Sequence, residues 1–357
     1  MSGTANRDGA RSGDAAPAPG YPVTLKHVAE AAQVHLSTAS RALDPEQSQR
    51  INTNTVARIR AIAEELGYTP DLVAAGLKRR RTGTVGVVVS EFANPYSSPL
   101  IRGVAHLLEQ KDLVALVAET VEDPKRLNKI IRHLLSRRVD ALITTAMHLD
   151  EAHLLDPARR SGTPIVLAGR ALPGHGIPAV VQDDFNGGQL AAHHLLGLGH
   201  HRLAQLLGPA NVDTFARRRL GFTTRLRGTP ARDLTVPVHA NAPSLEEGRR
   251  LMRLTLGMSE RPTGVFAQND LMAVGAMEAL AEAGLSCPGD VSIVGFNDVT
   301  LSSRLSPPLT TIRVPTEDVG RAAGLIALRL IEDPAAEVQD VVLPTTLVVR
   351  ASTRAVP

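Results

Sequence analysis

The chain has 357 residues, of which 43% are hydrophobic, and this is enough for two or three domains and excludes disorder throughout. Its single cysteine, Cys287, excludes an intramolecular disulfide framework and a cysteine-based zinc finger. No stretch has the length and apolarity of a membrane span and residues 1–20 lack the apolar core of a signal peptide, so we expect a cytoplasmic protein with no membrane partner.

The net charge of +3 is unevenly distributed. Residues 21–81 carry nine basic and six acidic side chains, whereas residues 1–20 and 82–357 are each balanced. This favours a small anion-binding module joined to a neutral body, although chance alone can also produce such a split. Residues 1–20 are rich in Gly, Ala, Ser and Pro and are interpreted as a disordered tail.

Residues 21–69 show helical patterns only. Thr24 is a good N-cap for a first helix, and a second, short helix is expected over residues 36–43. A third helix begins after Asn52 and stops at Gly67, because glycine suits the left-handed backbone that often follows a helix. Two helices joined by a three-residue turn and supported by a third predict a helix-turn-helix domain.

The second helix is expected to expose Leu36, Ser37 and Arg41 and to turn Ala39 and Leu43 inward. Hydroxyl groups near a helix N-terminus can bond phosphates or base edges, and arginine can bond O6 and N7 of guanine together. This pattern favours DNA binding over the plain alternative, which is a three-helix bundle with a solvated polar face. Residues 70–83, with their basic run Lys78–Arg81, are interpreted as a linker.

From residue 84 on, short apolar runs alternate with helical stretches such as Pro99–Lys111, Gly187–Leu198 and Leu271–Ala283. The apolar runs are Val85–Val89, Val114–Val117, Ala141–Thr144, Ile165–Leu167, Val180–Val181, Leu203–Leu207, Val265–Phe266 and Val291–Val294. This alternation predicts an α/β core of parallel sheets with helices on both faces. The length favours two doubly wound subdomains with a ligand cleft at the carboxyl ends of their strands.

The helical segment resembles the DNA-binding head of the LacI/GalR (lactose/galactose repressor) family. The similarity continues in the same order along nearly the whole chain after residue 22. It is carried by Ala63–Pro70, Arg81–Gly86, Asn94–Tyr96, Arg138–Ile143, His194–His200, Asn269–Ala273, Asp290–Phe296 and Pro307–Ile312.

The resemblance implies a homodimeric transcriptional regulator, of repressor type, that binds a pseudo-palindromic double-stranded operator DNA. It implies a head over residues 21–69, a hinge helix and linker over residues 70–83, and a core like that of periplasmic sugar-binding proteins. The first core subdomain takes residues 84–183 with about 314–335, and the second takes residues 184–313 with about 336–357. The expected effector is a sugar or sugar derivative, with no cofactor.

Positions that match the family's functional residues can be carried over one by one. The resemblance assigns base reading in the major groove to Leu36, Ser37 and Arg41. It assigns phosphate contacts to Thr24, Thr38 and Ser40, and insertion into the minor groove to Leu77. It assigns effector binding to Tyr96, Ser97, Arg218, Asn269 and Asn297. Leu77 could instead make a buried hinge contact, and Arg218 could instead be one exposed member of an Arg-rich run.

Several positions depart from the family pattern. Gln33 stands where the turn commonly has Gly, and is strained if its φ is positive. Gly76 weakens the predicted hinge helix by about 1 kcal/mol relative to Ala. Asn297 stands where Asp is frequent and Gly169 precedes Arg170 where Asp-Arg is frequent. The loss of two carboxylates leaves a neutral polyol possible and makes an anionic effector, such as a sugar phosphate, more plausible.

Other functions find less support. The runner-up is a solute-binding protein without a regulatory role, and a third alternative is an enzyme on an α/β scaffold, but no catalytic constellation is recognisable. His193-His194 and His200-His201 lack further ligands in the sequence, so solvated or capping histidines are favoured and no metal site is predicted.

Overall fold

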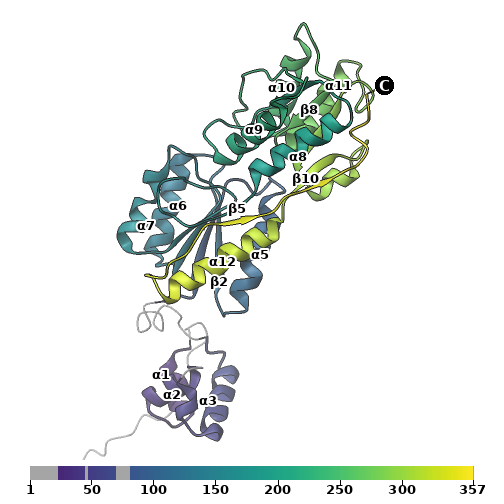
Figure 1. Ribbon diagram of the computed structural model, residues 1–357. Helices are drawn as coiled ribbons and strands as arrows, with labels where there is room; N and C mark the ends of the chain where they lie inside the picture. The colour runs from purple at the N-terminus through teal and green to yellow at the C-terminus, as the bar shows by residue number, and fades with distance from the viewer. Residues whose placement is uncertain (1–22, 45–46, 70–80, 357) are drawn as a thin grey trace, which may run out of the picture. The chain divides into compact units, whose positions relative to one another are not determined.

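The computed structural model describes residues 23–44, 47–69 and 81–356. They belong to two compact units, divided between Arg80 and Arg81 (Figure 1). The first unit is a helical head, and the second is a larger α/β core. The predicted disordered tail and Leu77 lie outside the described residues. Among the described helices, none is long and apolar enough to cross a membrane.

The head packs three α-helices and a short 3-10 helix around a small apolar core. The helices are α1 (Leu25–Ala31), α2 (Leu36–Leu43), η1 (Ser48–Arg50) and α3 (Thr53–Glu65). The fully buried side chains of α2 are the alanines Ala39 and Ala42, so α2 packs closely on its neighbours while its polar face stays free. Leu43, predicted to face inward, is half-buried against the same core. The predicted helix-turn-helix is confirmed.

Two backbone positions define the ends of helices in the head. Gly67 follows α3 with φ +68°, as expected for a helix C-terminus. Gln33 lies in the turn between α1 and α2 with φ 51°, so the strain foreseen for a residue with a Cβ is present. The turn is held by a hydrogen bond from the amide of Val34 to the carbonyl of Ala29 (3.0 Å).

The first core subdomain is a six-stranded sheet in the order β11-β5-β4-β3-β1-β2, in which every pairing is parallel. Helices α5 and α12 cover one face, and α6, α7 and the 3-10 helix η2 cover the other. The strands are β1 (Thr84–Val89), β2 (Val114–Glu119), β3 (Ala141–Thr144), β4 (Ile165–Ala168), β5 (Ala179–Gln182) and β11 (Val341–Leu343). The helices are α5 (Ser97–Glu109), α6 (Pro124–Ser136), η2 (Ala152–Leu155), α7 (Asp156–Ser161) and α12 (Thr316–Glu332).

The second subdomain repeats this plan with the order β12-β10-β9-β8-β6-β7, in which only β12 is antiparallel to its neighbour. Helices α8 and α9 cover one face, and α10 and α11 the other. The strands are β6 (Arg202–Leu206), β7 (Arg232–Asp233), β8 (Gly264–Ala267), β9 (Ser292–Asn297), β10 (Thr310–Arg313) and β12 (Thr346–Val348). The helices are α8 (Asp184–Gly197), α9 (Asp213–Leu226), α10 (Leu245–Leu256), α11 (Asp270–Glu282) and the 3-10 helix η3 (Thr300–Arg304).

The eight apolar runs recognised in the sequence are strands β1–β6, β8 and β9, and the predicted pair of doubly wound sheets is confirmed. Four short strands, β7 and β10–β12, were not predicted. Three of them lie at sheet edges, where one side of the strand meets solvent and the apolar pattern is weak.

One domain boundary differs from the prediction. The last passage of the chain into the second subdomain was expected near residue 336, but β11 pairs in parallel with β5, with Val341 opposite Val180. The chain therefore crosses between Leu343 and Thr346. Three half-exposed residues on an edge strand carry too little apolar pattern to show which sheet they join.

Candidate DNA-binding surface and ligand cleft

The exposed face of α2 carries the three side chains predicted to read bases. Leu36 is 47% exposed although it is apolar, and Ser37 and Arg41 are also exposed. Their α-helical spacing places Ser37 and Arg41 one turn apart, and the guanidinium Nε of Arg41 donates to the carbonyl of Ser37 (3.0 Å). The three predicted base-reading side chains therefore share one solvent-exposed face of α2.

His35 contributes to this face in a way that sequence reasoning missed. It is the N-cap of α2, and its Nδ1 accepts from the amide of Ser37 (3.3 Å) and lies 2.8 Å from the Ser37 hydroxyl. His35 therefore holds Ser37 at the first turn of the helix. The signal was its position directly before the helix, where a side-chain acceptor satisfies a free amide.

The predicted phosphate-contacting residues also lie at the surface of the head. Thr24 is the N-cap of α1, is exposed, and donates its backbone amide to Nδ1 of His27 (3.1 Å). Ser40 is exposed and Thr38 is half-buried on α2. Leu77, predicted to enter the minor groove, cannot be placed because it lies outside the described residues.

Within the core, a cavity of about 50 Å³ lies where the carboxyl ends of both sheets meet. The predicted ligand cleft is therefore present, and it is narrow. Its walls come from both subdomains: Ser90, Asn94, Tyr96, Thr145, Ala168, Gly169, Arg170 and Gln182 from the first, and Thr214, Phe215, Arg218, Pro243, Asn269 and Asn297 from the second.

Arg218 lines this cavity but is a buried residue with fixed partners. Its side chain is 4% exposed, its Nε donates to Asp184 Oδ1 (2.7 Å), and its Nη1 donates to the carbonyl of Gln268 (2.6 Å). The guanidinium also lies 3.6 Å from the centre of the Phe296 ring. Burial raises the pKa of Asp184 to about 6, against the opposing effect of Arg218. The alternative considered in the sequence analysis, that Arg218 is an exposed member of the Arg-rich run, is therefore wrong.

Tyr96 joins the first subdomain to this buried pair. Its hydroxyl donates to Gln182 Oε1 (3.2 Å), and Gln182 Nε2 donates to Asp184 Oδ2 (2.9 Å). Tyr96 also occupies the place of a side chain at Gly169, since a Cβ there would lie 2.5 Å from its hydroxyl oxygen. Gly169 has φ +74°, so both its backbone and the space around it require glycine.

The two predicted asparagines line the cleft, but only Asn297 has a free polar atom. Asn269 caps α11, accepting from the amide of Met272 (2.7 Å) and donating to the carbonyl of Pro243 (2.8 Å). Asn297 Oδ1 is buried and has no hydrogen-bond partner among the described residues, and the Asn297 backbone has φ 117°, which is unusual for a residue with a Cβ. A buried acceptor without a donor at the cleft wall is a place where a ligand hydroxyl fits.

Ser97 is the one predicted effector contact that the structure places away from the cavity. It is buried at the start of α5, and its hydroxyl donates to the carbonyl of Glu91 (2.6 Å). Its role in this conformation is to fix the loop before α5.

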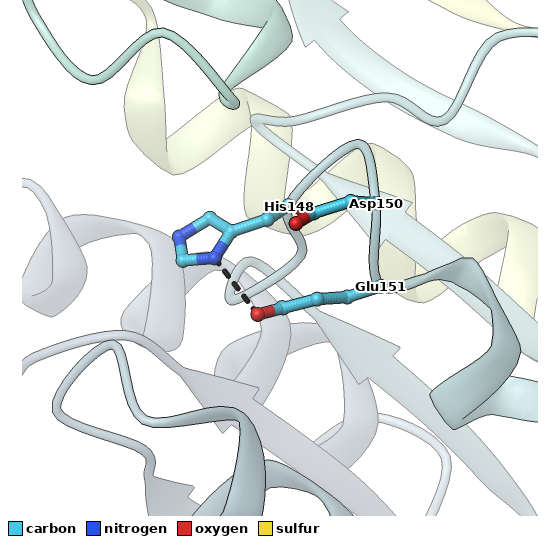
Figure 2. Close-up of side chains that lie close together, drawn as sticks. All are labelled: His148, Asp150 and Glu151. Atoms are coloured by element: carbon cyan, nitrogen blue, oxygen red, sulfur yellow. Dashed lines mark hydrogen bonds and ion pairs between the residues drawn. The ribbon is translucent and has the colours of Figure 1, made fainter.

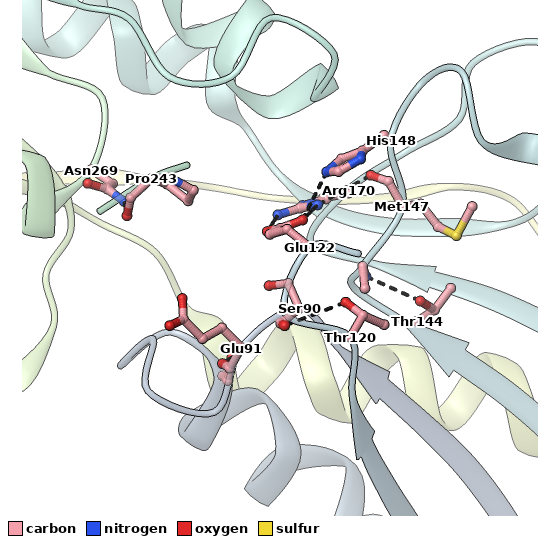
Figure 3. A network of polar contacts seen from close by, with 12 residues as sticks. Ser90, Glu91, Thr120, Glu122, Thr144, Met147, His148, Arg170, Pro243 and Asn269 are labelled. Atoms are coloured by element: carbon pink, nitrogen blue, oxygen red, sulfur yellow. Dashed lines mark hydrogen bonds and ion pairs between the residues drawn. The ribbon is translucent and has the colours of Figure 1, made fainter. Parts of the chain in front are cut away.

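A charged cluster borders the cleft in the first subdomain. His148 Nδ1 lies 3.0 Å from Glu151 Oε1 (Figure 2), and its Nε2 lies 2.9 Å from Glu122 Oε2. Arg170 donates from Nη2 to Glu122 Oε1 (2.6 Å) and from Nη1 to Glu122 Oε2 (3.1 Å). Burial opposes ionisation of Glu122, but Arg170 and His148 together outweigh it and hold its pKa below the usual value. In Figure 3, Glu122, His148 and Arg170 lie across from Asn269 and Pro243 of the second subdomain.

Sequence reasoning did not single out Arg170, Glu122, Gln182 or Asp184 as site residues. Gln182 is the last residue of β5, and the other three follow closely on the ends of predicted strands, at the edge where open α/β sheets bind ligands. That position was the available signal. The pairing of each arginine with its carboxylate was not visible, because the partners are far apart in the sequence.

The histidines set aside as metal ligands hold the end of the chain. His194 Nε2 lies 2.9 Å from the Thr353 hydroxyl, and His200 Nε2 lies 3.1 Å from the carbonyl of Arg354. His200 is buried rather than solvated, and burial lowers its pKa.

A wider surface groove of about 1320 Å³ runs beside β5, β11 and α12. The narrow cleft remains the better ligand site, because polar groups from both subdomains converge there and one of them, Asn297 Oδ1, lacks a partner.

The chain is similar to known regulatory proteins along most of its length. A model of bacterial regulatory proteins of the lacI family matches residues 24–71, and a periplasmic binding protein-like domain matches residues 192–353. The ribose operon repressor of Escherichia coli (strain K12) is 32% identical over 336 residues, covering 92% of this chain and 99% of the repressor.

Two solved structures extend the similarity to three dimensions. The lac repressor dimer bound to operator and the anti-inducer ONPF has a TM-score of 0.83 at 28% identity, and the match covers 94% of this chain and all of that one. A LacI family transcriptional regulator from Enterococcus faecium with bound ribose has a TM-score of 0.68 at 29% identity. That match covers 77% of this chain and all of that one.

Proposed function

Because the chain belongs to the LacI family of bacterial regulatory proteins, we propose that its head reads a pseudo-palindromic operator under the control of a small neutral molecule bound in the core cleft. The chain is a DNA-binding transcriptional regulator, and its relatives are transcriptional repressors. It acts as a homodimer, as the lac repressor dimer bound to its operator does. A solute-binding role without regulation is not favoured, because the head matches the family as well as the core does.

Leu36, Ser37 and Arg41 read base edges in the major groove. The observation that supports this is their common exposure on α2, with Arg41 already hydrogen-bonded to the carbonyl of Ser37 and thus held along the helix. On DNA, the guanidinium exchanges this weak surface contact for a bidentate bond to guanine. Leu36 offers apolar contact to a thymine methyl group.

Thr24, Thr38 and Ser40 contact phosphates and set the register of the head on the duplex. Leu77 enters the minor groove at the operator centre, where an apolar wedge opens a base step and bends the duplex. This last role rests on the family resemblance alone. Replacing Leu77 by Ala is expected to reduce DNA bending, which circular permutation gel-shift assays measure, and unchanged bending would contradict the role.

The effector is a neutral polyol of the size of a small sugar. Both arginines of the cleft have their charge matched by a carboxylate, Arg170 by the half-buried Glu122 and Arg218 by the buried Asp184, so the charges that an anionic ligand would need are already paired. Asn297 Oδ1 lacks a donor, which a sugar hydroxyl supplies. The ion pairs therefore weigh against the anionic effector that the loss of acidic residues suggested. One relative of this fold has ribose bound.

Ligand binding acts on DNA affinity through closure of the cleft. The chain passes between the subdomains at three places, after β5, after β10 and after β11, so the subdomains can rotate as bodies about these passages. A ligand that favours one degree of closure changes the orientation of the first subdomain of one protomer relative to that of its partner. The distance between the two heads changes with it. A tenfold effect on DNA affinity needs only about 1.4 kcal/mol of differential binding.

Two measurements test the proposal. Selection from a library of random duplexes is expected to return pseudo-palindromic sites, and failure to enrich any sequence would refute operator reading. Calorimetric titration with D-ribose and D-ribose 5-phosphate is expected to favour the neutral sugar, and a clear preference for the phosphate would refute the neutral effector. A cytoplasmic location is part of the same proposal, since the operator is chromosomal DNA.

A further inference from the structure

We propose that His35 determines which bases Ser37 can read, because it binds the hydrogen of the Ser37 hydroxyl and leaves the oxygen as an acceptor only. The inference rests on the proposed function, in which Ser37 reads a base edge in the major groove. The base that Ser37 reads must then carry an amino group, so it is adenine or cytosine. His35 is a positioning residue, since it acts on the DNA through Ser37.

The backbone amide of Ser37 fixes the role of the imidazole nitrogen that faces it. His35 is the N-cap of α2, and its Nδ1 accepts from this amide (3.3 Å). An amide nitrogen can only donate, so Nδ1 carries no hydrogen. The Ser37 Oγ lies 2.8 Å from the same Nδ1. Because Nδ1 has no hydrogen to offer, the hydroxyl is the donor, and the two donors share Nδ1 as donors often share an acceptor at helix ends.

The second neighbour of the Ser37 hydroxyl has the matching polarity. A serine hydroxyl has one hydrogen and two lone pairs, so with its hydrogen bound to His35 it can only accept. Arg41 Nη2, which can only donate, lies 3.5 Å from Ser37 Oγ. Both described side-chain contacts of Oγ therefore assign the same direction to the hydroxyl. When Arg41 turns to a guanine, as the proposed function requires, the lone pairs of Ser37 Oγ are free for a base.

The edges of the bases in the major groove convert this polarity into a sequence preference. Adenine presents its N6 amino group and cytosine its N4 amino group as donors, whereas guanine presents O6 and N7 and thymine presents O4, which are all acceptors. An acceptor-only oxygen that faces O6 or O4 leaves two desolvated acceptors without a hydrogen between them. A free serine hydroxyl can rotate and bond either kind of edge, so the discrimination comes from His35.

The test uses the full-length chain and an operator that it selects from a library of random duplexes. Ser37→Ala first identifies the base pair that Ser37 reads, because the preference at that position is lost in this variant. Operators with each of the four bases at the position are then compared by fluorescence anisotropy. The native chain is expected to bind the adenine and cytosine operators about tenfold more tightly than the guanine and thymine operators.

The decisive variant is His35→Gly, which removes the acceptor of the Ser37 hydroxyl. Glycine is tolerated at an N-cap and His35 is exposed, so α2 is expected to keep its structure, which amide hydrogen exchange checks. The difference between the two pairs of operators is expected to fall to about twofold or less, because the hydroxyl can then donate to guanine or thymine. This is a change in base preference, which a purely structural cap would not produce.

The matched control is His27→Ala. His27 is the other histidine of the head whose Nδ1 accepts from a backbone amide, that of Thr24 (3.1 Å), but it bonds no hydroxyl among the described residues. Its replacement is expected to leave the preference at the Ser37 position unchanged.

The possible failures are distinguishable. If Ser37→Ala changes no base preference, Ser37 does not read a base, and both its proposed role and this inference are refuted. If Ser37→Ala reveals a position at which the native chain prefers guanine or thymine, only the inference is overturned. The same holds if the native preference persists in His35→Gly, or if His35→Gly weakens all four operators equally, since His35 then only caps the helix.

Discussion

The head and the cleft use their polar side chains in opposite ways. On α2 the residues assigned to DNA reading are exposed, and their contacts are local, within one turn of the same helix. In the cleft, Arg218 and Asp184 are 4% and 1% exposed and form an ion pair between α8 and α9. The head therefore offers groups that are free to bind, whereas the cleft offers groups that are already bound to one another.

This difference teaches what each surface can recognise. An exposed arginine can turn toward a base at little cost, because it gives up only weak, solvated contacts. A buried arginine with a carboxylate partner cannot be recruited without leaving a charge unpaired. Under the proposed function, we therefore expect the cleft to recognise its ligand mainly through its shape and through Asn297 Oδ1, the buried side-chain acceptor that has no partner among the described residues, while the arginines hold the walls in place.

The largest expected effect comes from breaking the buried pair. Arg218→Ala is expected to lower the free energy of unfolding of the core by about 3–5 kcal/mol, because it leaves the Asp184 carboxylate buried without its partner. Chemical denaturation followed by circular dichroism measures this change. The exposed neighbour Arg219 provides the control, and Arg219→Ala is expected to stay within about 0.5 kcal/mol of the native chain. Equal effects of the two substitutions would show that the pair is not structural.

A second prediction concerns Asp270, a buried carboxylate that forms no ion pair with the described residues. Asp270 accepts from the Thr311 and Ser302 hydroxyls and from the amide of Val299, and burial raises its pKa from the usual value of a carboxyl group to about 6. A raised folded-state pKa favours the fold at low pH, and this contribution is lost as the pH rises through about 6.

Asp270→Asn removes this titration. The stability of the native chain relative to the variant is therefore expected to increase by about 2 kcal/mol between pH 7 and pH 4. Urea denaturation at both pH values measures the difference. A difference that does not change with pH would contradict the raised pKa.

A third prediction tests the head. Arg41→Ala is expected to cost about 1–3 kcal/mol in operator binding and to relax the preference at one base position in each half-site. Binding to a set of operator variants, measured by fluorescence anisotropy, separates the two effects. Arg58→Ala, which removes an exposed arginine from α3, is the control and is expected to keep the base preference. If Arg41→Ala weakens all variants equally, Arg41 contacts a phosphate instead.

The smallest effect is expected in the turn of the head. Gln33→Gly relieves the positive φ of 51° and is expected to stabilise the head by up to about 1 kcal/mol. Ala31→Gly, in the last turn of α1, is the matched control and is expected to destabilise it by a similar amount. Amide hydrogen exchange of α1 and α2 in the intact chain measures both. Faster exchange in Gln33→Gly would contradict the strain.

Much of the fold followed from local patterns. The eight apolar strands and the helices of the head show up as patterns of apolar residues within short segments. These patterns depend only on neighbouring residues, so the sequence was sufficient to predict the elements. The short edge strands were missed because they bury one side at most, and β11 was assigned to the wrong subdomain because three residues do not reveal their partner strand.

The residues of the candidate sites show the same difference between local patterns and contacts between distant segments. By itself the sequence determined that Leu36, Ser37 and Arg41 share one face of α2, because their spacing follows the period of a single helix. Only the tertiary structure decided that Arg170 faces Glu122, that Arg218 faces Asp184, and that His148 stands between two carboxylates. The physical reason is that contacts within a helix depend on residues three or four apart, whereas these pairs meet only when strands and helices distant in the chain pack at one edge of a sheet.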